Sequence, residues 1–358
     1  MRRTILMRVG LLFVLSPGLA VTSRASEEEQ DVDPLPAWEK TWDDKETEAC
    51  IRDRIGAVDV QRMSKHLFFL AKDPLPYRKL NFTLPGHVKN TLYEADDYLT
   101  SRLESWGYRV DREGVRVQAF RRDTNKPKQH QYSRPMPEDP WYTAYNLYAE
   151  KRGRTCPQEI IIVLAHKDSQ SWIDSPGAND NAIGTVSVLE LACVLAEYPC
   201  ERTLRFLFCN EEHTPWTSVT AARNAQDRGD NIVAVFNLDG VGAKSAEETA
   251  AGKRTNVTAY TVPAGERLAA LMAAANKRFS IGLEQRVVKR PGPGDDDGSF
   301  VKAGYAAAVV NIGSWPYADP NYHGEGDIPE RCDVPNAAQA VQATLAALLT
   351  IDRTGAGD

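Results

Sequence analysis

The chain has 358 residues, of which 26% are charged and 42% are apolar, values ordinary for a soluble globular protein. The formal net charge of −6 and the pI near 5.7 give no basic footprint, which argues against nucleic acid as a partner. The length fits one large α/β domain or two ordinary domains, and length alone does not choose between them.

The N-terminus is typical of an exported protein. The basic segment "MRRTILMR" precedes an apolar run of about a dozen residues, and Ser23 and Ala25 follow at the small-residue positions of a cleavage site. A membrane-spanning helix needs about 20 apolar residues, so we expect residues 1–25 to be a cleaved signal peptide and the mature chain to have no span. The mature protein is then expected in the periplasm or outside the cell. Residues 26–48 are acidic and contain proline, which predicts a loosely ordered lead-in.

The first half of the mature chain contains helical periodicity followed by strand-like alternation. Helices are predicted over residues 58–70 and 88–106, and the second ends before Gly107, a favourable residue just past a helix. "YRVDRE" and "VRVQAF" alternate in the manner of a β-hairpin. The polar, proline-rich stretch over residues 121–140 predicts a long surface loop.

Strands and helices alternate regularly from residue 158 onward. "EIIIVLAH" is a nearly continuous apolar run, as expected of a strand that is covered on both faces. Alternation of this kind predicts an α/β fold with a mostly parallel mixed central sheet and helices on both faces, formed by residues 49–358 as a single domain. The further strands are predicted over residues 203–209, 231–239, 256–262, 283–290 and 305–312, and the helices over residues 182–197, 217–228, 266–278 and 336–351.

Acids and histidines follow the predicted strands. Ligands of open α/β sheets bind beyond the carboxyl ends of the strands, so these side chains are expected to meet at one edge. Imidazole and carboxylate are the ligands of a zinc site without cysteine, and none of the six cysteines forms a CxxC pair. The residues concerned are His166 and Asp168, Asp180, Glu211 and Glu212, Asp239, and then Tyr322, His323 and Asp327.

Each of these residues alone has a plainer interpretation. His166 would fit a core histidine, Asp180 a helix N-cap, the two glutamates a solvated turn, and Asp239 a turn before glycine. Their joint occurrence at one sheet edge favours a functional site over five separate accidents. Burial of two adjacent carboxylates is costly unless they are paired or bound to a metal.

The ordered motifs H-x-D, N-D-N, N-E-E, L-D-G and Y-H, spread over residues 146–349, resemble a known enzyme family. This is the zinc exopeptidase family of secreted bacterial aminopeptidases and aminopeptidase Y, with its phosphorylase/hydrolase-like architecture. Glutamate carboxypeptidase and, more distantly, the glutaminyl-peptide cyclotransferases also belong to it. The resemblance implies two zinc ions bridged by Asp180. One ion would be held by His166, Asp180 and Asp239, and the other by Asp180, Glu212 and His323.

The resemblance also implies roles for the neighbouring residues. Glu211 would be the general base and the Tyr322 hydroxyl would stabilise the oxyanion. Asp168 would orient His166, and a cis peptide bond would follow Asp180. Two metal ions about 3.5–4 Å apart can share a water, lower its pKa and polarise a substrate carbonyl.

The sequence departs from the family pattern at several positions. "DDDGSF" stands where S-D-H-x-P-F is common in the family. The three acids of this segment would either hold the ammonium of a free N-terminus or form a solvated acidic loop. They are Asp295, Asp296 and Asp297. Lys167 replaces the usual aromatic residue and is expected to point away from the metals. His213 is expected to shape the pocket rather than to bind metal.

These observations predict an exported dinuclear zinc exopeptidase, an aminopeptidase that hydrolyses peptides or small amides. A glutaminyl-peptide cyclotransferase with one zinc ion and a non-catalytic, metal-stabilised binding domain are the alternatives. The presence of His166 and Asp239 with two adjacent glutamates favours hydrolysis. Amino- versus carboxypeptidase action, side-chain preference, native metal, disulfide pairing and oligomeric state stay open.

Overall fold

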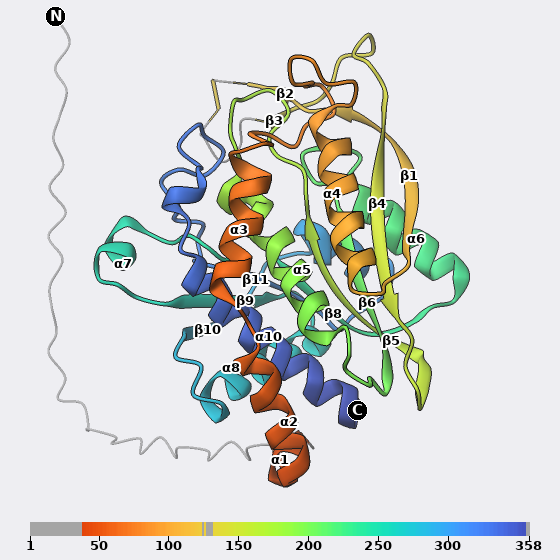
Figure 1. Ribbon diagram of the computed structural model, residues 1–358, viewed down its shortest axis with the longest axis vertical. Coiled ribbons are helices and arrows are strands. Elements are labelled where there is room, and N and C mark those ends of the chain that lie inside the picture. The colour runs from red at the N-terminus through yellow and green to blue at the C-terminus, as the bar shows by residue number, and fades with distance from the viewer. Residues whose placement is uncertain (1–37, 124, 127–131, 356–358) are drawn as a thin grey trace, which may run out of the picture. The chain divides into compact units, whose positions relative to one another are not determined.

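The computed structural model describes residues 38–123, 125–126 and 132–355, and its centre is a mixed sheet of nine strands (Figure 1). The sheet order is β10-β9-β11-β8-β5-β6-β4-β1-β7. Four central strands are parallel, and their carboxyl ends meet at one edge. They are β11 (Ala308–Ile312), β8 (Asn231–Leu238), β5 (Cys156–His166) and β6 (Arg202–Cys209).

The strands outside this centre are mostly antiparallel. On one side β9 is antiparallel to β11 and parallel to β10, and on the other side β4, β1 and β7 follow β6 in antiparallel pairs. A mixed sheet between helices confirms the predicted α/β class. The outer strands are β9 (Thr255–Tyr260), β10 (Glu284–Lys289), β4 (Tyr142–Lys151), β1 (Val110–Ala119) and β7 (His213–Thr214), and β2 (Arg121–Arg122) pairs separately with β3 (Tyr132–Ser133).

Successive side chains of a strand point to opposite faces of the sheet. Each face is covered by a hydrophobic core that helices help to form. In β5, Ile161 and Val163 belong to the larger hydrophobic core, whereas Ile162 and Leu164 belong to a second core on the other face. Helices α3, α4, α5, α8 and α10 contribute to the first core, and α6 and α9 to the second. Their bounds are α3 (Val60–Ala71), α4 (Thr91–Ser105), α5 (Ile183–Leu195), α6 (Thr217–Arg228), α8 (Pro263–Arg278), α9 (Asp295–Lys302) and α10 (Val334–Thr354).

Helix α10 crosses the core and is apolar over most of its length. Among the described residues it is the one helix that is long and apolar enough to cross a membrane. Of its apolar window, 83% is buried inside the fold. It therefore has the burial expected of a core helix.

The hairpin predicted over residues 108–120 is wrong. Residues Val110–Ala119 form one continuous strand, and Gly114 pairs with Tyr145 of β4 instead of making a turn. The alternation in the sequence was a true strand signal. However, the partner strand comes from a later segment, which the local pattern does not show.

The prediction of a loosely ordered lead-in is also wrong where the structure describes that segment. Residues 38–48 lie in helices α1 (Trp38–Asp43) and α2 (Lys45–Gly56), and Asp44 caps the second helix. Trp38 and Trp42 are buried, and Trp42 Nε1 donates to Thr350 Oγ1 of α10 at 2.8 Å. The acidic composition suggested disorder, but the burial of two tryptophans stabilises these helices against the rest of the fold. The predicted signal peptide and residues 26–37 lie outside the described residues.

The remaining short elements are α7 (Ala246–Ala250), the π-turn η2 (Ala178–Ala182) and the 3₁₀ turn η3 (Pro329–Arg331). All six cysteines are unpaired thiols in this structure. The helices and strands from Trp38 onward belong to one compact unit.

Candidate active site

His166 ends β5, and Asp168 organises the chain around it. The fully buried Asp168 carboxylate lies 3.2 Å from His166 Nδ1 and accepts hydrogen bonds from the backbone N–H of Glu211 (2.9 Å) and Glu212 (2.8 Å). His213 Nδ1 lies 2.7 Å from the same carboxylate. Burial alone would raise the pKa of Asp168, but the bonds to His166 and His213 outweigh it and hold the pKa below its ordinary value. Asp168 therefore orients His166 and fixes the loop that carries both glutamates.

Asp180 lies in the turn η2 that leads into α5. The Asp180–Asn181 peptide bond is cis, as the family resemblance implies. The backbone N–H groups of Asn179 and Asp180 donate to the Asp327 carboxylate at 2.7 and 3.0 Å. Asp327 thereby holds the turn in place.

The Asp180 side chain faces two imidazoles. It does not cap α5, whose N-cap residue Ala182 makes no side-chain bond. Its Oδ1 lies 3.1 Å from His166 Nε2, and its Oδ2 lies 2.8 Å from His323 Nε2. Burial would raise the pKa of Asp180, but the two histidines outweigh burial and lower it. One carboxylate thus connects the two halves of the site.

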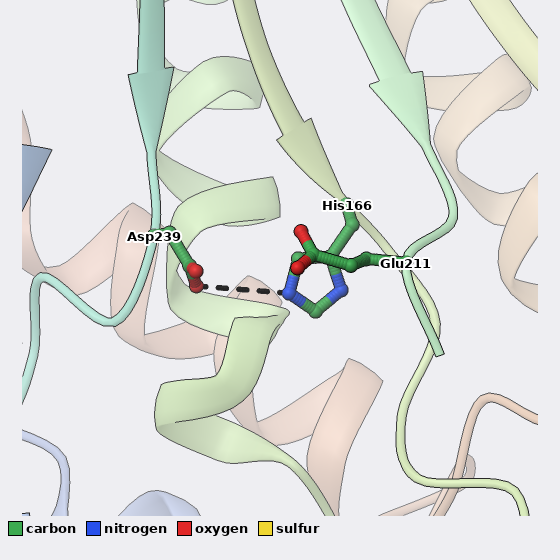
Figure 2. Close-up of side chains that lie close together, drawn as sticks. All are labelled: His166, Glu211 and Asp239. Carbon is green, nitrogen blue, oxygen red and sulfur yellow. Dashed lines mark ion pairs between the residues drawn. The ribbon is translucent and has the colours of Figure 1, made fainter. Parts of the chain in front are cut away.

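The first group of potential ligands is His166, Glu211 and Asp239, which converge from three neighbouring strands (Figure 2). Asp239 Oδ1 lies 3.6 Å from His166 Nε2, and one ligand atom from each of the three residues lies within 4.8 Å of the others. Burial and the charge of Asp295 raise the pKa of Asp239 to about 7. Burial, Asp295 and Asp296 raise the pKa of Glu211 well above its ordinary value. The resemblance implies that Glu211 is a base, and a raised pKa suits that role.

The second group is Asp180, Glu212 and His323. Glu212 is buried, its Oε1 lies 3.7 Å from His323 Nε2, and its Oε2 accepts from Gln170 Nε2 at 2.9 Å. Gln170 therefore turns one Glu212 oxygen away and leaves the other toward the histidine. The solvated-turn interpretation of this glutamate is excluded by its burial.

Tyr322 lies beside this second group. Its ring stacks on the His323 ring with the centroids 3.7 Å apart. Burial and the charges of Asp180, Asp239 and the two glutamates raise the pKa of Tyr322 well above its ordinary value. The phenol is therefore neutral and able to donate a hydrogen bond among the four acids.

The donor set fits zinc. Among the described residues, the buried atoms Asp180 Oδ2, Asp239 Oδ1 and Glu211 Oε2 have no hydrogen-bond partner. Asp180 Oδ2 lies 2.8 Å from His323 Nε2, so the two groups are close enough to bind one ion together. Buried carboxylates without partners are costly unless they bind a metal, and carboxylate with imidazole suits Zn²⁺. His166, Asp180 and Asp239 would hold one ion, and Asp180, Glu212 and His323 the other.

The role of Asp296 and Asp297 in binding a substrate ammonium stays a prediction, and their burial does not favour it. Both are fully buried in the first turn of α9, so they do not form a solvated loop. Asp297 pairs with Arg290, and Asp296 Oδ2 accepts a hydrogen bond from the Cys209 thiol at 3.0 Å. Their neighbour Asp295 is partly exposed.

Two expectations about neighbours of the site are confirmed. Lys167 points away from the metal ligands and lies 2.8 Å from Asp96 Oδ1 and 2.8 Å from Asn210 Oδ1. His213 is fully buried and bonds Asp168, so it shapes the site.

Arg78 is a site residue that the sequence analysis missed. Its buried guanidinium donates to the carbonyl oxygens of Lys167 (2.7 Å), Leu70 (2.6 Å), Pro176 (2.7 Å) and Gly177 (2.7 Å). Burial lowers its pKa to about 10, while the acids of the site act in the opposite direction. It ties the segment that follows His166 to the segment before Asp180. No local motif marks it, because it acts through backbone oxygens from distant segments.

Comparison with known proteins places the chain among zinc-dependent peptidases. The profile of peptidase family M28 matches residues 146–349. A probable zinc metalloprotease of Pyrenophora tritici-repentis is 26% identical over 212 residues, which is 50% of this chain and 42% of the relative. An aminopeptidase of Bacillus subtilis is 39% identical over 66 residues, or 18% of this chain and 14% of that protein. The chain thus spans less than half the length of these curated relatives.

Solved structures share the fold. An aminopeptidase from Aneurinibacillus sp. strain AM-1 superposes with a TM-score of 0.63 at 17% identity, covering 83% of this chain and 95% of that one. A glutaminyl cyclase of Bacteroides thetaiotaomicron has a TM-score of 0.62 at 16% identity, covering 82% and 98%. At such low identity the likeness shows the fold alone. Because an aminopeptidase and a cyclase both match, the fold does not separate those two activities.

Proposed function

Because the chain belongs to peptidase family M28, we propose that it is an exported zinc aminopeptidase with two metal ions. It would hydrolyse the N-terminal bond of a peptide or small amide. The observation that carries this proposal is the position of Asp180, whose two oxygens face His166 and His323 respectively. Asp239 and Glu212 complete two ligand groups around that shared carboxylate.

The residues around the metals supply the proton transfers. When bound, zinc provides Lewis acidity, which polarises a carbonyl and lowers the pKa of a water. Glu211 takes a proton from the water that attacks the carbonyl carbon. The Tyr322 hydroxyl donates a hydrogen bond to the oxygen that becomes negative. As the C–N bond breaks, Glu211 passes the proton to the leaving nitrogen.

Two features position the base for this work. Asp168 holds the backbone N–H of Glu211 at 2.9 Å, and one buried Glu211 oxygen has no partner among the described residues. Burial in an acidic surrounding raises the pKa of Glu211, which strengthens it as a proton acceptor near neutral pH.

The test begins with metal stoichiometry. Elemental analysis of the purified chain, set against protein concentration, is expected to give two zinc ions per chain. One or none, after zinc is offered at neutral pH, would contradict the bridging role of Asp180.

Peptide products then separate the candidate activities. Mass spectrometry is expected to show loss of the N-terminal residue from peptides with a free amine and no cleavage of N-acetylated ones. A product of unchanged chain length from an N-terminal Gln peptide would indicate a cyclotransferase. Bound zinc without turnover of any peptide would indicate a binding domain.

Export is supported by the basic, apolar and small-residue segments at the N-terminus. Expression of the full chain in a bacterium followed by cell fractionation tests it. A mature protein outside the cytoplasm whose first residue is Ser26 is expected. Retention of residues 1–25 on a cytoplasmic protein would contradict this part of the proposal.

A further inference from the structure

The loop formed by residues 169–177 joins two segments of the site, because it lies between His166 and Asp180 in the chain. Arg78 holds both of its ends. The Arg78 N–H donates to Ser169 Oγ at 3.0 Å, and the Ser169 N–H donates to the Arg78 carbonyl at 2.9 Å. At the other end the Arg78 guanidinium binds the carbonyl of Gly177 at 2.7 Å. The ends of this loop are therefore fixed relative to the rest of the fold.

The middle of the loop is fixed on either side of Trp172. Asn81 Nδ2 donates to the Ser171 carbonyl at 2.8 Å, and Lys79 Nζ donates to the Ile173 carbonyl. Ser171 and Ile173 are both buried, with 5% of each exposed, whereas 48% of Trp172 between them is exposed. The backbone therefore holds a half-exposed indole in a defined position.

The residues just before Trp172 bind the chain that carries the two glutamates. Ser171 Oγ donates to the Glu212 carbonyl at 2.9 Å and lies 3.3 Å from His213 Nε2. Gln170 Nε2 donates to Glu212 Oε2 at 2.9 Å. Trp172 is thus one residue along the chain from a direct contact with the glutamate segment. These contacts place its backbone beside the site without reference to any charge.

Packing within the fold does not account for the exposed half of the Trp172 side chain. Single apolar residues on a surface are common and by themselves indicate nothing. Trp141, which is 49% exposed, has the Arg116 guanidinium over its ring at 5.7 Å. Among the described residues, the Trp172 ring has no aromatic or cationic partner of this kind. A large apolar ring on a fixed loop beside the site indicates a surface for a ligand.

The proposed reaction indicates which part of a substrate would lie there. Glu211 gives its proton to the leaving nitrogen, so the residue that follows the scissile bond begins next to Glu211. Glu212, the next residue in the chain, is the one that Ser171 binds. Trp172 is therefore on the leaving side of the site. An indole buries and stacks well against an aromatic or large aliphatic side chain, and a loop that is already fixed has little ordering cost on binding.

We propose that Trp172 is a specificity-determining residue that binds the side chain of the residue after the scissile bond and favours an aromatic or large apolar one there. The inference rests on the proposed aminopeptidase function and adds to it. It assigns the substrate preference to the second residue of the peptide, whose side chain leaves with the amine product.

Trp172→Ala tests the proposal on dipeptide amides with free N-termini. We expect the wild type to prefer Ala-Phe amide over Ala-Ala amide in kcat/KM, and the variant to lose about 10-fold of that preference, as for loss of one buried aromatic contact. The ratio of Phe-Ala amide to Ala-Ala amide, which reports the N-terminal residue, should stay the same. Equal Ala-Phe ratios in the two proteins, or a change confined to Phe-Ala amide or to Ala-Lys amide, would overturn the proposal.

The controls separate recognition from stability and from the loss of any surface tryptophan. Zinc content and the thermal midpoint of Trp172→Ala should match those of the wild type, and Trp172→Phe should keep part of the preference. Trp141→Ala removes a tryptophan of nearly equal exposure that precedes β4 and should leave the Ala-Phe ratio unchanged. An equal loss with Trp141→Ala would show that the effect is not specific to Trp172 and would overturn the proposal.

A binding experiment keeps the inference separate from the proposed function. The probes are Ala-Phe amide and Ala-Ala amide in which a methylene group replaces the scissile carbonyl, so that neither can be hydrolysed. Calorimetric titration of zinc-loaded protein is expected to show about 10-fold weaker binding of the Phe probe to Trp172→Ala than to the wild type, and equal binding of the Ala probe. If the wild type cleaves no peptide, the proposed function fails, and this titration still decides the role of Trp172. Equal affinity of the two proteins for the Phe probe would reject that role.

Discussion

Two regions of the molecule are rich in charge, and their charges are arranged in opposite ways. At the carboxyl ends of β5, β6 and β8, carboxylates lie against histidines, and three of their buried oxygens have no hydrogen-bond partner within the part of the chain that the structure describes. On the side of β1, β4 and β6, a cleft of about 530 Å³ is lined by side chains that have ion-pair or hydrogen-bond partners, some inside the cleft and some beside it. It is lined by Arg109, Asp111, Arg112, Glu113, Tyr148, Glu150, Arg205 and Arg228.

The cleft is a sizeable hollow, yet it offers little chemistry. Arg205 pairs with Glu150 at 2.9 Å and with Asp230 at 2.6 Å, and Glu113 accepts from Tyr148 at 2.8 Å. Side chains that already have ion-pair or hydrogen-bond partners do not need a ligand to neutralise their charge. The comparison teaches that buried charge without partners, rather than cavity size, marks a reactive site.

The largest expected effect is at the base. Glu211→Gln keeps the shape of the side chain but removes its ability to accept a proton. We expect kcat on a free-amine peptide to fall about 10²- to 10⁴-fold with two zinc ions still bound. Full turnover in a variant with unchanged zinc content would show that Glu211 is not the base.

A buried pair beside the site gives the next effect. Lys167→Met removes the partner of the fully buried Asp96, whose pKa is already raised by burial. We expect the free energy of unfolding to fall by about 3–5 kcal/mol, as for one broken half of a buried ion pair. Urea unfolding measures this loss. A change as small as that of a surface pair would show that the ion pair is not important for stability.

The buried His66 predicts a pH dependence remote from the metals. Burial, with the nearby cations Arg102, Arg62 and Lys65, lowers its pKa from 6.5 to about 4, and its Nδ1 lies 2.6 Å from the Tyr98 hydroxyl. Protonation therefore favours the unfolded chain, so this stability is fully present above pH 6.5 and is lost as the pH falls toward 4. The loss is at most about 3 kcal/mol.

The measurement is unfolding of zinc-depleted protein between pH 4 and pH 7, for the wild type and for His66→Gln. The variant should depend less on pH over this range, whatever its stability at pH 7. Parallel curves for the two proteins would contradict the assignment to His66.

Asp168→Asn is expected to weaken the binding of zinc at the site. The change removes the charge that orients His166 and weakens the anchor of the glutamate loop. We expect zinc affinity, measured by competition with a chelator, to fall about 10- to 100-fold. Unchanged affinity would mean that His166 is held by other contacts.

The smallest effect is expected in the cleft. The exposed Arg228 pairs with Asp230 at 2.8 Å, and Asp230 also has Arg205 as a partner. Arg228→Gln should change the free energy of unfolding by only about 0–1 kcal/mol and leave peptide turnover unaltered. Loss of turnover would give the cleft a functional role and reverse the comparison.

Sequence patterns predicted the structure correctly in the region where short motifs and the spacing of apolar residues determine it. The apolar run that ends at His166 and the strands after it predicted the parallel centre and the edge where the acids meet. The resemblance on short motifs, and the family it named, are confirmed by the family match over residues 146–349. The ligand roles within those motifs stay predictions until metal is measured.

The remaining features depend on contacts between distant segments. The hairpin was mispredicted because β1 takes its partner from β4, beyond a long loop. The lead-in was mispredicted because Trp42 bonds Thr350, 308 residues further along the chain. Gln170 was missed for the same reason, since its role appears only when its loop meets Glu212.

Arg78 connects the N-terminal helices to the catalytic edge, although it precedes the family match, which begins at residue 146. A fragment trimmed to the matched residues would lack this guanidinium and the α3 carbonyl of Leu70 that it also binds. The segments that carry Asp168 and Asp180 would then lose their shared donor. The minimal catalytic fragment of this chain is therefore longer than its recognisable motifs, and should begin upstream of α3.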